Sequence, residues 1–309
     1  MKNRIPHTQV KYIAMSILGA FMIQASCYAS TFVTGKDNNK QVMVNGYSMS
    51  FVEQGKGEPL ILIHGALSDY RTWKKLLNEL AEYNRTIAVS LRHYYPEKWD
   101  GKGSDLTIDQ HVEDMAEFIK KLGAGPVNIA GHSRGGAVAM LLASRYPKLV
   151  KNLVLADPAP LYSMLSDKPA AIKSMNNRKQ VLKKSMAHYQ KGDIDSGLKE
   201  FVEYIAGENA WKKTDKKRRN TLRQNALTLN SLNQDAKTRF SCEQLRKVTS
   251  PVLLITGEYS KSVYYQMNGA VESCLKNTTK VVISDAGHMM FVANPTAFIF
   301  EVQDFIIPQ

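Results

Sequence analysis

Short apolar runs and longer amphipathic stretches alternate along most of the chain. The apolar runs are rich in Val, Ile and Leu and have the length of strands buried on both faces, while the longer stretches repeat apolar residues at helical spacing. This alternation predicts an α/β protein whose mostly parallel sheet is covered by helices on both faces. The expected buried strands are 59–65, 86–91, 126–130, 153–156, 251–256 and 280–284, and the expected helices are 73–83, 108–122, 136–146 and 295–306.

A hairpin is expected before the first of these strands. The segment QVMVNGYSMSFVEQG at 41–55 alternates apolar and polar residues on either side of Asn45-Gly46. Asn-Gly is a strong signal for a two-residue turn, because both positions take positive φ angles. We therefore expect two antiparallel strands that meet at this dipeptide.

Residues 160–235 interrupt the alternation, since they contain amphipathic helical stretches and no buried-strand run. One stretch begins at Asp193, a residue suited to cap a helix, and stops at Gly207. We interpret 160–235 as a helical cap inserted into a core formed by 30–159 and 236–309.

The first 29 residues have the layout of a secretory signal peptide: basic residues, a short apolar run and then small residues up to Ala29. The alternative is a membrane anchor that stays attached. Cleavage after Ala29 would make the protein periplasmic or secreted. Cys242 and Cys274 would then remain as a pair in an oxidising compartment, where they form one disulfide or stay as two buried thiols.

The formal net charge is +13, and the excess is concentrated at 168–223, which holds 15 Lys and Arg against 6 Asp and Glu. Its most basic run is WKKTDKKRRNTLR at 211–223. Such a run is commonly a solvated helix face; the other interpretations are contact with an anionic surface and attraction of an anionic substrate. We expect no nucleic-acid partner.

The segment NIAGHSRGGAVAM at 128–140 places Ser133 between two glycines, where a strand is expected to turn sharply into a helix. Three other segments accompany it in order: LILIHG at 60–65, PVLLITGE at 251–258 and ISDAGHMMFVANP at 283–295. With these four segments the chain resembles the α/β-hydrolase superfamily, and the resemblance covers essentially all of the chain after the expected signal peptide. It implies an α/β-hydrolase fold with a helical cap.

The resemblance implies that Ser133 is the nucleophile and that His288 is its base. It also implies that main-chain N–H groups of Ala66 and Arg134 bind the oxyanion. The side chains at these two positions are then free to vary.

The acid of the expected triad has two candidates. The resemblance places an aspartate three residues beyond Gly257, but the chain has Ser260 there. Asp157, at the end of the preceding strand, is a position used by some family members. Glu258 is the alternative, two residues before the usual position. We favour Asp157 because strand-end geometry would aim Glu258 elsewhere.

Residues expected to contact the substrate are His64 and Gly65 beside the first buried strand, and His93 and Tyr94 in the loop SLRHYYPEKW at 90–99. Aromatic residues in such loops also serve as packing residues. No Gly-rich phosphate loop and no metal-ligand spacing occurs in the sequence, so we expect neither a cofactor nor a metal.

The sequence therefore predicts an exported serine hydrolase that cleaves a carboxylic ester or a similar acyl bond of a small molecule. If the basic run attracts the substrate, that substrate is anionic. Alternatives on the same fold are a carbon-carbon hydrolase, an aminopeptidase and a haloperoxidase-like enzyme. The resemblance disfavours epoxide hydrolases, which use aspartate at the position of Ser133. A ligand-binding protein with little turnover is the alternative outside the enzymes.

Overall fold

The computed structural model describes residues 33–34, 39–235 and 237–307. The signal peptide expected over 1–29 lies outside the described residues. In the ranges that are described, no helix combines the length and the apolar character needed to cross a membrane.

Among the described residues, one sheet of nine strands forms the centre of the molecule, in the order β1-β2-β3-β5-β4-β6-β7-β8-β9. The pairs from β5 to β9 are parallel, and β1, β2 and β3 join them through antiparallel pairs. The sheet is therefore mostly parallel, as predicted. The strands are β1 (Val33–Thr34), β2 (Lys40–Val44), β3 (Tyr47–Gln54), β4 (Pro59–Ile63), β5 (Arg85–Val89), β6 (Val127–His132), β7 (Val150–Ala156), β8 (Val252–Gly257) and β9 (Thr278–Ile283).

The predicted hairpin is confirmed. Strands β2 and β3 pair antiparallel, and Val44 faces Tyr47 across the turn. Asn45 and Gly46 have φ angles of 45° and 74°. Positive φ at both central residues gives the turn a twist that matches the twist of the strands.

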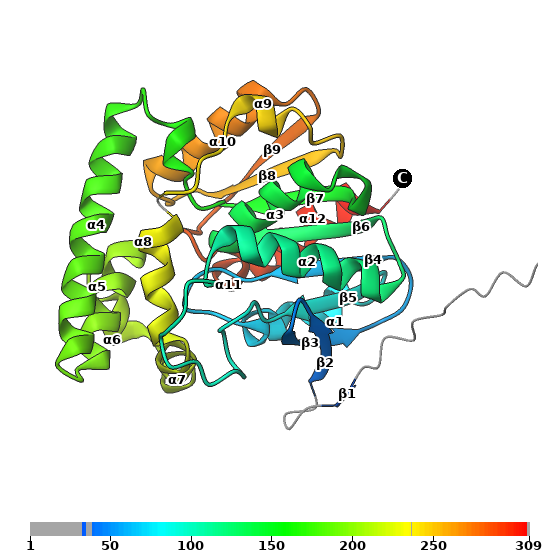
Figure 1. Cartoon of the computed structure of the whole chain (residues 1–309). Coiled ribbons are helices and arrows are strands. Elements are labelled where there is room, and N and C mark those ends of the chain that lie inside the picture. The colour runs from blue at the N-terminus through cyan, green and yellow to red at the C-terminus, as the bar shows by residue number, and fades with distance from the viewer. Residues whose placement is uncertain (1–32, 35–38, 236, 308–309) are drawn as a thin grey trace, which may run out of the picture.

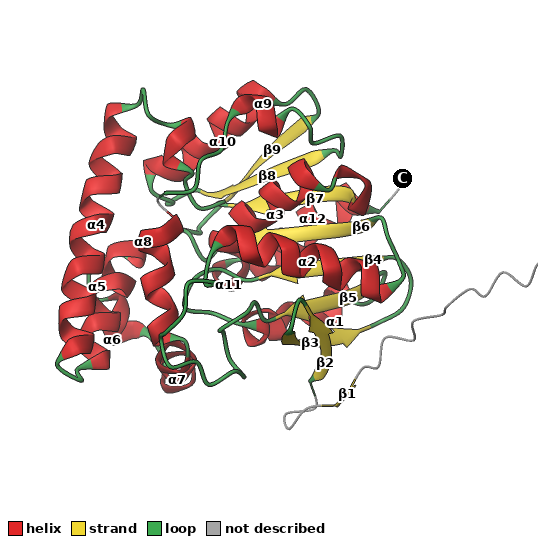
Figure 2. Ribbon diagram, in the orientation of Figure 1, coloured by secondary structure: helices red, strands yellow, loops and turns green. Residues whose placement is uncertain are grey.

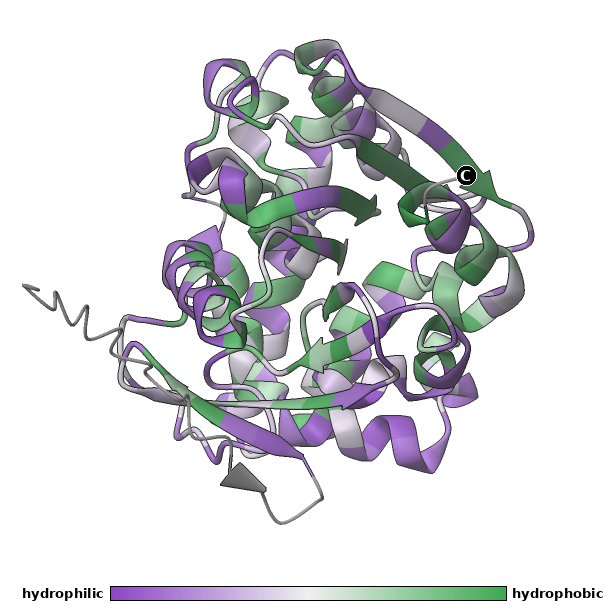
Figure 3. Cartoon of the chain, turned by 90° about the vertical axis from the view of Figure 1, so that its right-hand side faces the viewer, coloured by the Kyte–Doolittle hydropathy of each residue, from purple (hydrophilic) through white to green (hydrophobic). Residues whose placement is uncertain are grey.

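Helices cover both faces of the sheet, which confirms the predicted layers (Figure 2). The core on one face includes side chains of α2 (Ile108–Leu122), α3 (Arg134–Arg145) and α10 (Ser262–Cys274). The core on the other face includes side chains of α1 (Lys74–Leu80) and α12 (Pro295–Ile306). Hydrophobic colouring is concentrated on the strands in the middle of the molecule, with hydrophilic stretches on the outer loops and helices (Figure 3).

The prediction that 280–284 forms a buried strand is wrong in one respect. The strand exists as β9, but it is the last strand of the sheet and most of its side chains are partly or fully exposed. Val282 keeps 53% of its surface accessible. An edge strand has a neighbour on one side only, so an apolar run there does not require burial on both faces.

Five further helices lie within 160–235 and gather at one end of the sheet (Figure 1). Apolar side chains from several of them form a separate cluster that also contains Leu67 from the core. Asp193 caps α5 by accepting a hydrogen bond from the Ser196 main chain, and the helix stops at Gly207, as predicted. These helices are α4 (Pro169–Gln190), α5 (Ile194–Ala206), α6 (Ala210–Lys213), α7 (Lys216–Gln224) and α8 (Ser231–Asp235).

Cys242 and Cys274 form a disulfide, which decides between the two alternatives left open by the sequence. Cys242 begins the short helix α9 (Cys242–Leu245), and Cys274 ends α10. The bond therefore joins two helices that flank strand β8 in the chain.

Candidate active site

The turn between β6 and α3 carries the serine of the Gly-x-Ser-x-Gly motif. Ser133 has φ of 52° and ψ of −119°, a conformation that non-glycine residues adopt only where the surrounding structure holds it. A Cβ on Gly131 would lie 2.5 Å from the Gly135 carbonyl oxygen, and one on Gly135 would lie 2.3 Å from that of Ile63. Neither position has room for a side chain, as the motif predicts.

A histidine and an aspartate come together from the ends of two other strands. Asp157 directly follows β7, and His288 lies between β9 and the short helix α11 (Met290–Ala293). His288 Nδ1 and Asp157 Oδ2 are 3.1 Å apart, and both residues are buried. Donation from Nδ1–H to the carboxylate leaves Nε2 without a proton and able to accept one.

Burial shifts both of these groups toward their neutral forms. It lowers the pKa of His288 to about 3, and the positive charge of Lys261 acts in the same direction. Burial raises the pKa of Asp157, while the hydrogen bond from the Ser260 hydroxyl opposes this by stabilising the carboxylate. At neutral pH the imidazole is therefore in the form that serves as a base.

Two aromatic rings surround the His288 imidazole. Tyr264 on α10 stacks on it, with ring centroids 4.2 Å apart, and places its hydroxyl 3.3 Å from Nε2. Burial lowers the pKa of His132, so this neutral ring donates from Nε2 to the His288 carbonyl at 2.8 Å. Within the described ranges no hydrogen bond joins Ser133 Oγ to His288, and the Tyr264 hydroxyl faces Nε2 instead.

The turn after β8 holds the other two residues considered for the acid position. Ser260 donates its hydroxyl hydrogen to Asp157 Oδ2 at 2.5 Å. Glu258 is exposed, and its carboxylate accepts a hydrogen bond of 2.9 Å from the Asp285 main chain. The structure thus brings Asp157 to His288 and leaves Glu258 at the surface.

A cavity of about 750 Å³ has Ser133 and His288 in its wall, together with residues of α5 and α7. Mostly apolar cavities with a few polar groups are typical of small-molecule sites. Its apolar lining includes Leu67, Phe201, Val202, Ile205, Leu222, Met289 and Val292. Its basic lining consists of Arg71, Lys74, Lys75, Lys213, Lys217 and Arg218.

Comparison with known proteins places this arrangement in a family. The family described as the alpha/beta hydrolase fold matches residues 58–295, a segment that includes Ser133, Asp157 and His288. The chain belongs to the α/β-hydrolase family. The protein is therefore a hydrolase of this fold.

Known α/β-hydrolases similar to this one carry out different reactions. The soluble epoxide hydrolase of Corynebacterium sp. (strain C12) is 34% identical over 120 residues, which are 39% of this chain and 41% of that protein. The 2-hydroxy-6-oxo-6-(2'-aminophenyl)hexa-2,4-dienoic acid hydrolase of Metapseudomonas resinovorans is 24% identical over 261 residues, covering 83% and 87%. A thermophilic esterase from Thermogutta terrifontis superposes with a TM-score of 0.69 at 20% identity, covering 90% and 97%.

The two predicted oxyanion donors of this α/β-hydrolase lie at the Ser133 turn. Ala66 is in the cavity wall. It follows Gly65, where a Cβ would lie 3.0 Å from the Cβ of Ser133. Arg134 is the first residue of α3, where main-chain N–H groups have no partner within the helix.

The Arg134 side chain has a role that the sequence did not predict. It is fully buried and donates to both carboxylate oxygens of Asp235 on α8, at 2.7 and 3.1 Å. It also donates to His111 Nδ1 at 2.6 Å. The side chain therefore ties the Ser133 turn to a cap helix, so this position is not free to vary.

None of the four residues predicted to contact the substrate lines the cavity, so that prediction is wrong. His64 is fully buried and accepts a hydrogen bond from the Leu91 main chain at 3.1 Å. Tyr94 is also buried and packs on His64 with ring centroids 4.7 Å apart. The loop after β5 folds back on the core and brings Tyr94 onto His64, which directly follows β4. Gly65 packs against the Ser133 turn, since a Cβ on it would lie 3.0 Å from that of Ser133, and it too is outside the cavity wall.

His93 is the last of the four predicted residues. Its two ring nitrogens each lie 2.9 Å from a carboxylate, those of Glu97 and Asp105. The ring also stacks on Trp99. Burial lowers the pKa of His93, but the two carboxylates outweigh it and raise the value. This histidine holds its own loop together and does not line the cavity of the hydrolase.

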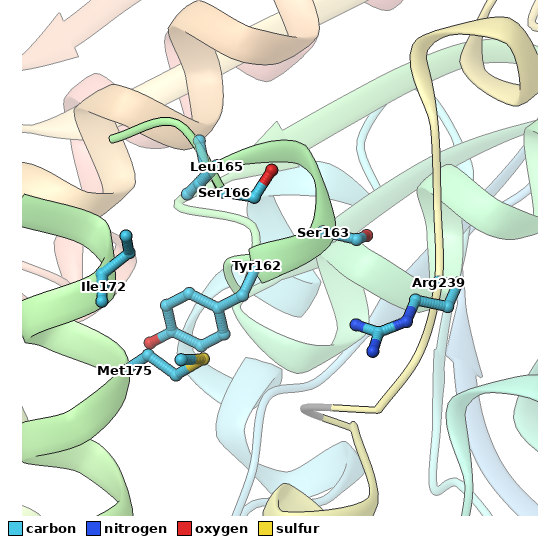
Figure 4. Close-up of a pocket in the computed structure, with 7 residues that line it drawn as sticks. All are labelled: Tyr162, Ser163, Leu165, Ser166, Ile172, Met175 and Arg239. Carbon is cyan, nitrogen blue, oxygen red and sulfur yellow. The ribbon is translucent and has the colours of Figure 1, made fainter. Parts of the chain in front are cut away.

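A second, smaller cavity of about 320 Å³ lies beside the start of α4 (Figure 4). The ring of Tyr162 lies next to Met175, and Arg239 reaches in from the opposite wall. Neither Ser133 nor His288 lines it. In the described parts of the chain, no three His, Cys, Asp or Glu side chains converge as metal ligands do.

Proposed function

We propose that this α/β-hydrolase is a serine hydrolase that cleaves a carboxylic ester or a similar acyl bond of a small molecule. The contact of 3.1 Å between Asp157 and His288 carries the proposal. It pairs the acid with the base, and the base lines the same cavity as Ser133. A serine hydroxyl is a weak nucleophile and needs a base. The base in turn needs an acid that holds its tautomer and stabilises the imidazolium.

The proposed reaction proceeds through an acyl-enzyme. Ser133 Oγ attacks the substrate carbonyl carbon while its proton passes to His288 Nε2, and the amides of Ala66 and Arg134 donate to the oxyanion that forms. The bond to the leaving alcohol breaks, and the alcohol oxygen takes the proton from Nε2. Water then attacks the acyl group with His288 again as base, which releases the carboxylic acid and restores Ser133.

The Tyr264 hydroxyl has a consequence for the first step. It lies 3.3 Å from Nε2, on the atom that must receive the Ser133 proton. Catalytic hydrogen bonds of ligand-free enzymes are often long and tighten when the substrate binds. The proposal therefore requires the Ser133 hydroxyl to replace that of Tyr264 at Nε2 during turnover.

The test is labelling of the folded protein with a fluorophosphonate, read by intact mass and peptide mapping, with Ser133→Ala as the control. We expect one label per chain on Ser133 and none on the variant. Absence of labelling on the folded wild-type protein would contradict the proposal and favour a ligand-binding protein with little turnover.

A carbon-carbon hydrolase is the second candidate, since the Metapseudomonas resinovorans dienoic acid hydrolase aligns over 83% of this chain. The same three residues would act on a ketone, with a carbon leaving group in place of the alcohol. Comparing kcat/KM for simple nitrophenyl esters with that for such a dienoic acid separates the two. A higher value for the esters supports the first candidate.

We also propose that the protein is exported to the periplasm or secreted. The layout of residues 1–29 supports this, and so does the Cys242–Cys274 disulfide, because disulfides persist in oxidising compartments. Cell fractionation with intact-mass analysis tests it. We expect a chain that begins at Ser30 outside the cytoplasm, and an uncleaved cytoplasmic chain with free thiols would contradict the proposal.

A further inference from the structure

The wall of the large cavity carries more positive than negative side chains. Six basic residues line it, against two acidic ones, Glu208 and Asp215. Asp215 is already engaged at the start of α7, where it accepts a hydrogen bond from the Arg218 main chain at 2.8 Å. The cavity therefore has a surplus of positive charge beside the apolar lining from α5.

With Arg71, Arg218 is one of the two basic residues of this wall that are not fully exposed. Its side chain is partly buried and donates to the Ser68 hydroxyl at 3.3 Å, two residues after Ala66. Among the described residues it has no carboxylate within ion-pair distance. Burial lowers the pKa of Arg218, and the negative charges of Asp69 and Asp215 oppose this shift only in part, without a direct ion pair.

Neighbouring arginines differ from Arg218 because they have their own partners. Arg219 donates to the main-chain oxygens of Trp211 and Lys212. Arg223 forms an ion pair with Asp195 at 2.6 Å. The guanidinium of Arg218 is thus the one in the 211–223 run that lies in the cavity wall, and it forms no ion pair there.

Arg71, the other arginine of the cavity wall, is also paired. It donates to both carboxylate oxygens of Asp69, at 2.8 and 2.7 Å. The same carboxylate receives a hydrogen bond from Asn225 at 2.7 Å. Asp69 is therefore engaged directly by these two partners, and its charge acts on Arg218 only from beyond ion-pair distance.

Arg218 also lies within electrostatic reach of the Ser133 turn. After burial and the nearby His288, its charge contributes to lowering the pKa of His132, the residue before Ser133. A guanidinium fork matches the geometry of a carboxylate, and the paired hydrogen bonds are stronger than neutral ones.

We propose that Arg218 binds a carboxylate of the substrate, so that the preferred esters carry a carboxylate separated from the scissile carbonyl by an apolar chain. The inference rests on the proposed serine hydrolase function. The apolar chain would lie against the α5 residues Phe201, Val202 and Ile205. The other basic residues of the wall would draw the anion toward the cavity.

The experiment compares two series of nitrophenyl esters at constant ionic strength. One series consists of monoesters of linear dicarboxylic acids, and the other has the distal carboxylate capped as a methyl ester. The measured quantity is the ratio of kcat/KM for each anionic ester to that for its capped partner. The proteins are the wild type, Arg218→Met, Arg218→Lys and the matched control Lys216→Met, which removes an exposed charge from the same helix outside the cavity wall.

We expect the ratio to exceed one in the wild type and to fall about tenfold or more in Arg218→Met, the size expected for losing a charge-assisted hydrogen bond. Arg218→Lys should lie between them, and Lys216→Met should match the wild type. An unchanged ratio in Arg218→Met would overturn the proposal. Equal falls in Arg218→Met and Lys216→Met would also overturn it, because they would indicate general attraction by the basic surface.

Binding without turnover separates this inference from the proposed function. Titration calorimetry of the Ser133→Ala protein with a dicarboxylic monoester should give a weaker affinity when Arg218→Met is added. A loss of affinity with no fluorophosphonate labelling of the wild type would retain the carboxylate site and reject the serine hydrolase. Inorganic phosphate that displaces the monoester at equal concentration would overturn the assignment to a carboxylate.

Discussion

Ser260 Oγ donates a hydrogen bond of 2.5 Å to Asp157 Oδ2, the oxygen that also lies 3.1 Å from His288 Nδ1. Ser260 occupies the position where the family resemblance leads one to expect the acid. The ends of β7 and β8 therefore reach the same point beside the imidazole. The carboxylate of Asp157 follows β7, and the hydroxyl of Ser260, after β8, donates a hydrogen bond to it.

This geometry predicts the effect of removing each candidate acid. Asp157→Asn should lower kcat by about 10³- to 10⁴-fold, because an amide neither holds the productive imidazole tautomer nor stabilises the imidazolium. Glu258→Gln is the matched control and should cost little, since Glu258 is exposed and contacts the Asp285 main chain. Turnover of a neutral ester measures both. The reverse ranking would reject Asp157 as the acid.

The convergence of the two strand ends predicts a partial rescue. In the double variant Asp157→Asn with Ser260→Asp, the new carboxylate starts from a position within hydrogen-bond distance of residue 157. We expect kcat to recover roughly tenfold over Asp157→Asn alone, the scale of one charge-assisted hydrogen bond. The Ser260→Asn variant in the Asp157→Asn background is the control without charge. Equal activity of the two double variants would show that position 260 cannot reach His288.

The lowered pKa of His288 predicts the acid limb of the pH profile. The base must be neutral, so kcat/KM falls as the pH drops through the His288 pKa. Because burial lowers this pKa from the ordinary 6.5, protonation of the imidazole should reduce kcat/KM only below pH 6.5. A neutral ester avoids titration of the substrate, and circular dichroism checks folding at each pH. A midpoint above 6.5 would contradict the prediction.

The buried ion pair between Arg134 and Asp235 predicts a large effect on stability. Asp235→Asn leaves the buried guanidinium without its counter-charge, which costs about 3 to 5 kcal/mol when such a pair is broken from one side. The control is Asp195→Asn, which breaks the exposed pair with Arg223 and should cost at most about 1 kcal/mol. Urea unfolding measures both. Equal losses would mean that Arg134 does not tie the cap to the Ser133 turn.

The sequence by itself determined the elements whose signals are local. The hairpin at Asn45-Gly46 and the helix between Asp193 and Gly207 depend on residues within a few positions of one another, and both are as predicted. The apolar runs likewise predicted the parallel strands. The Ser133 turn was readable for the same reason, since its two glycines lie two residues away on either side.

Only the tertiary structure decided which side chains meet. Asp157 is 131 positions from His288 and 103 from Ser260, and the choice between Asp157 and Glu258 depends on how neighbouring strand ends pack. Likewise, the burial of Tyr94 against His64 follows from a loop that folds over the core. Arg218 is left without an ion pair because Asp69 is bound by Arg71 and Asn225. Such distances come from packing across the whole sheet and its cap, which local periodicity does not encode.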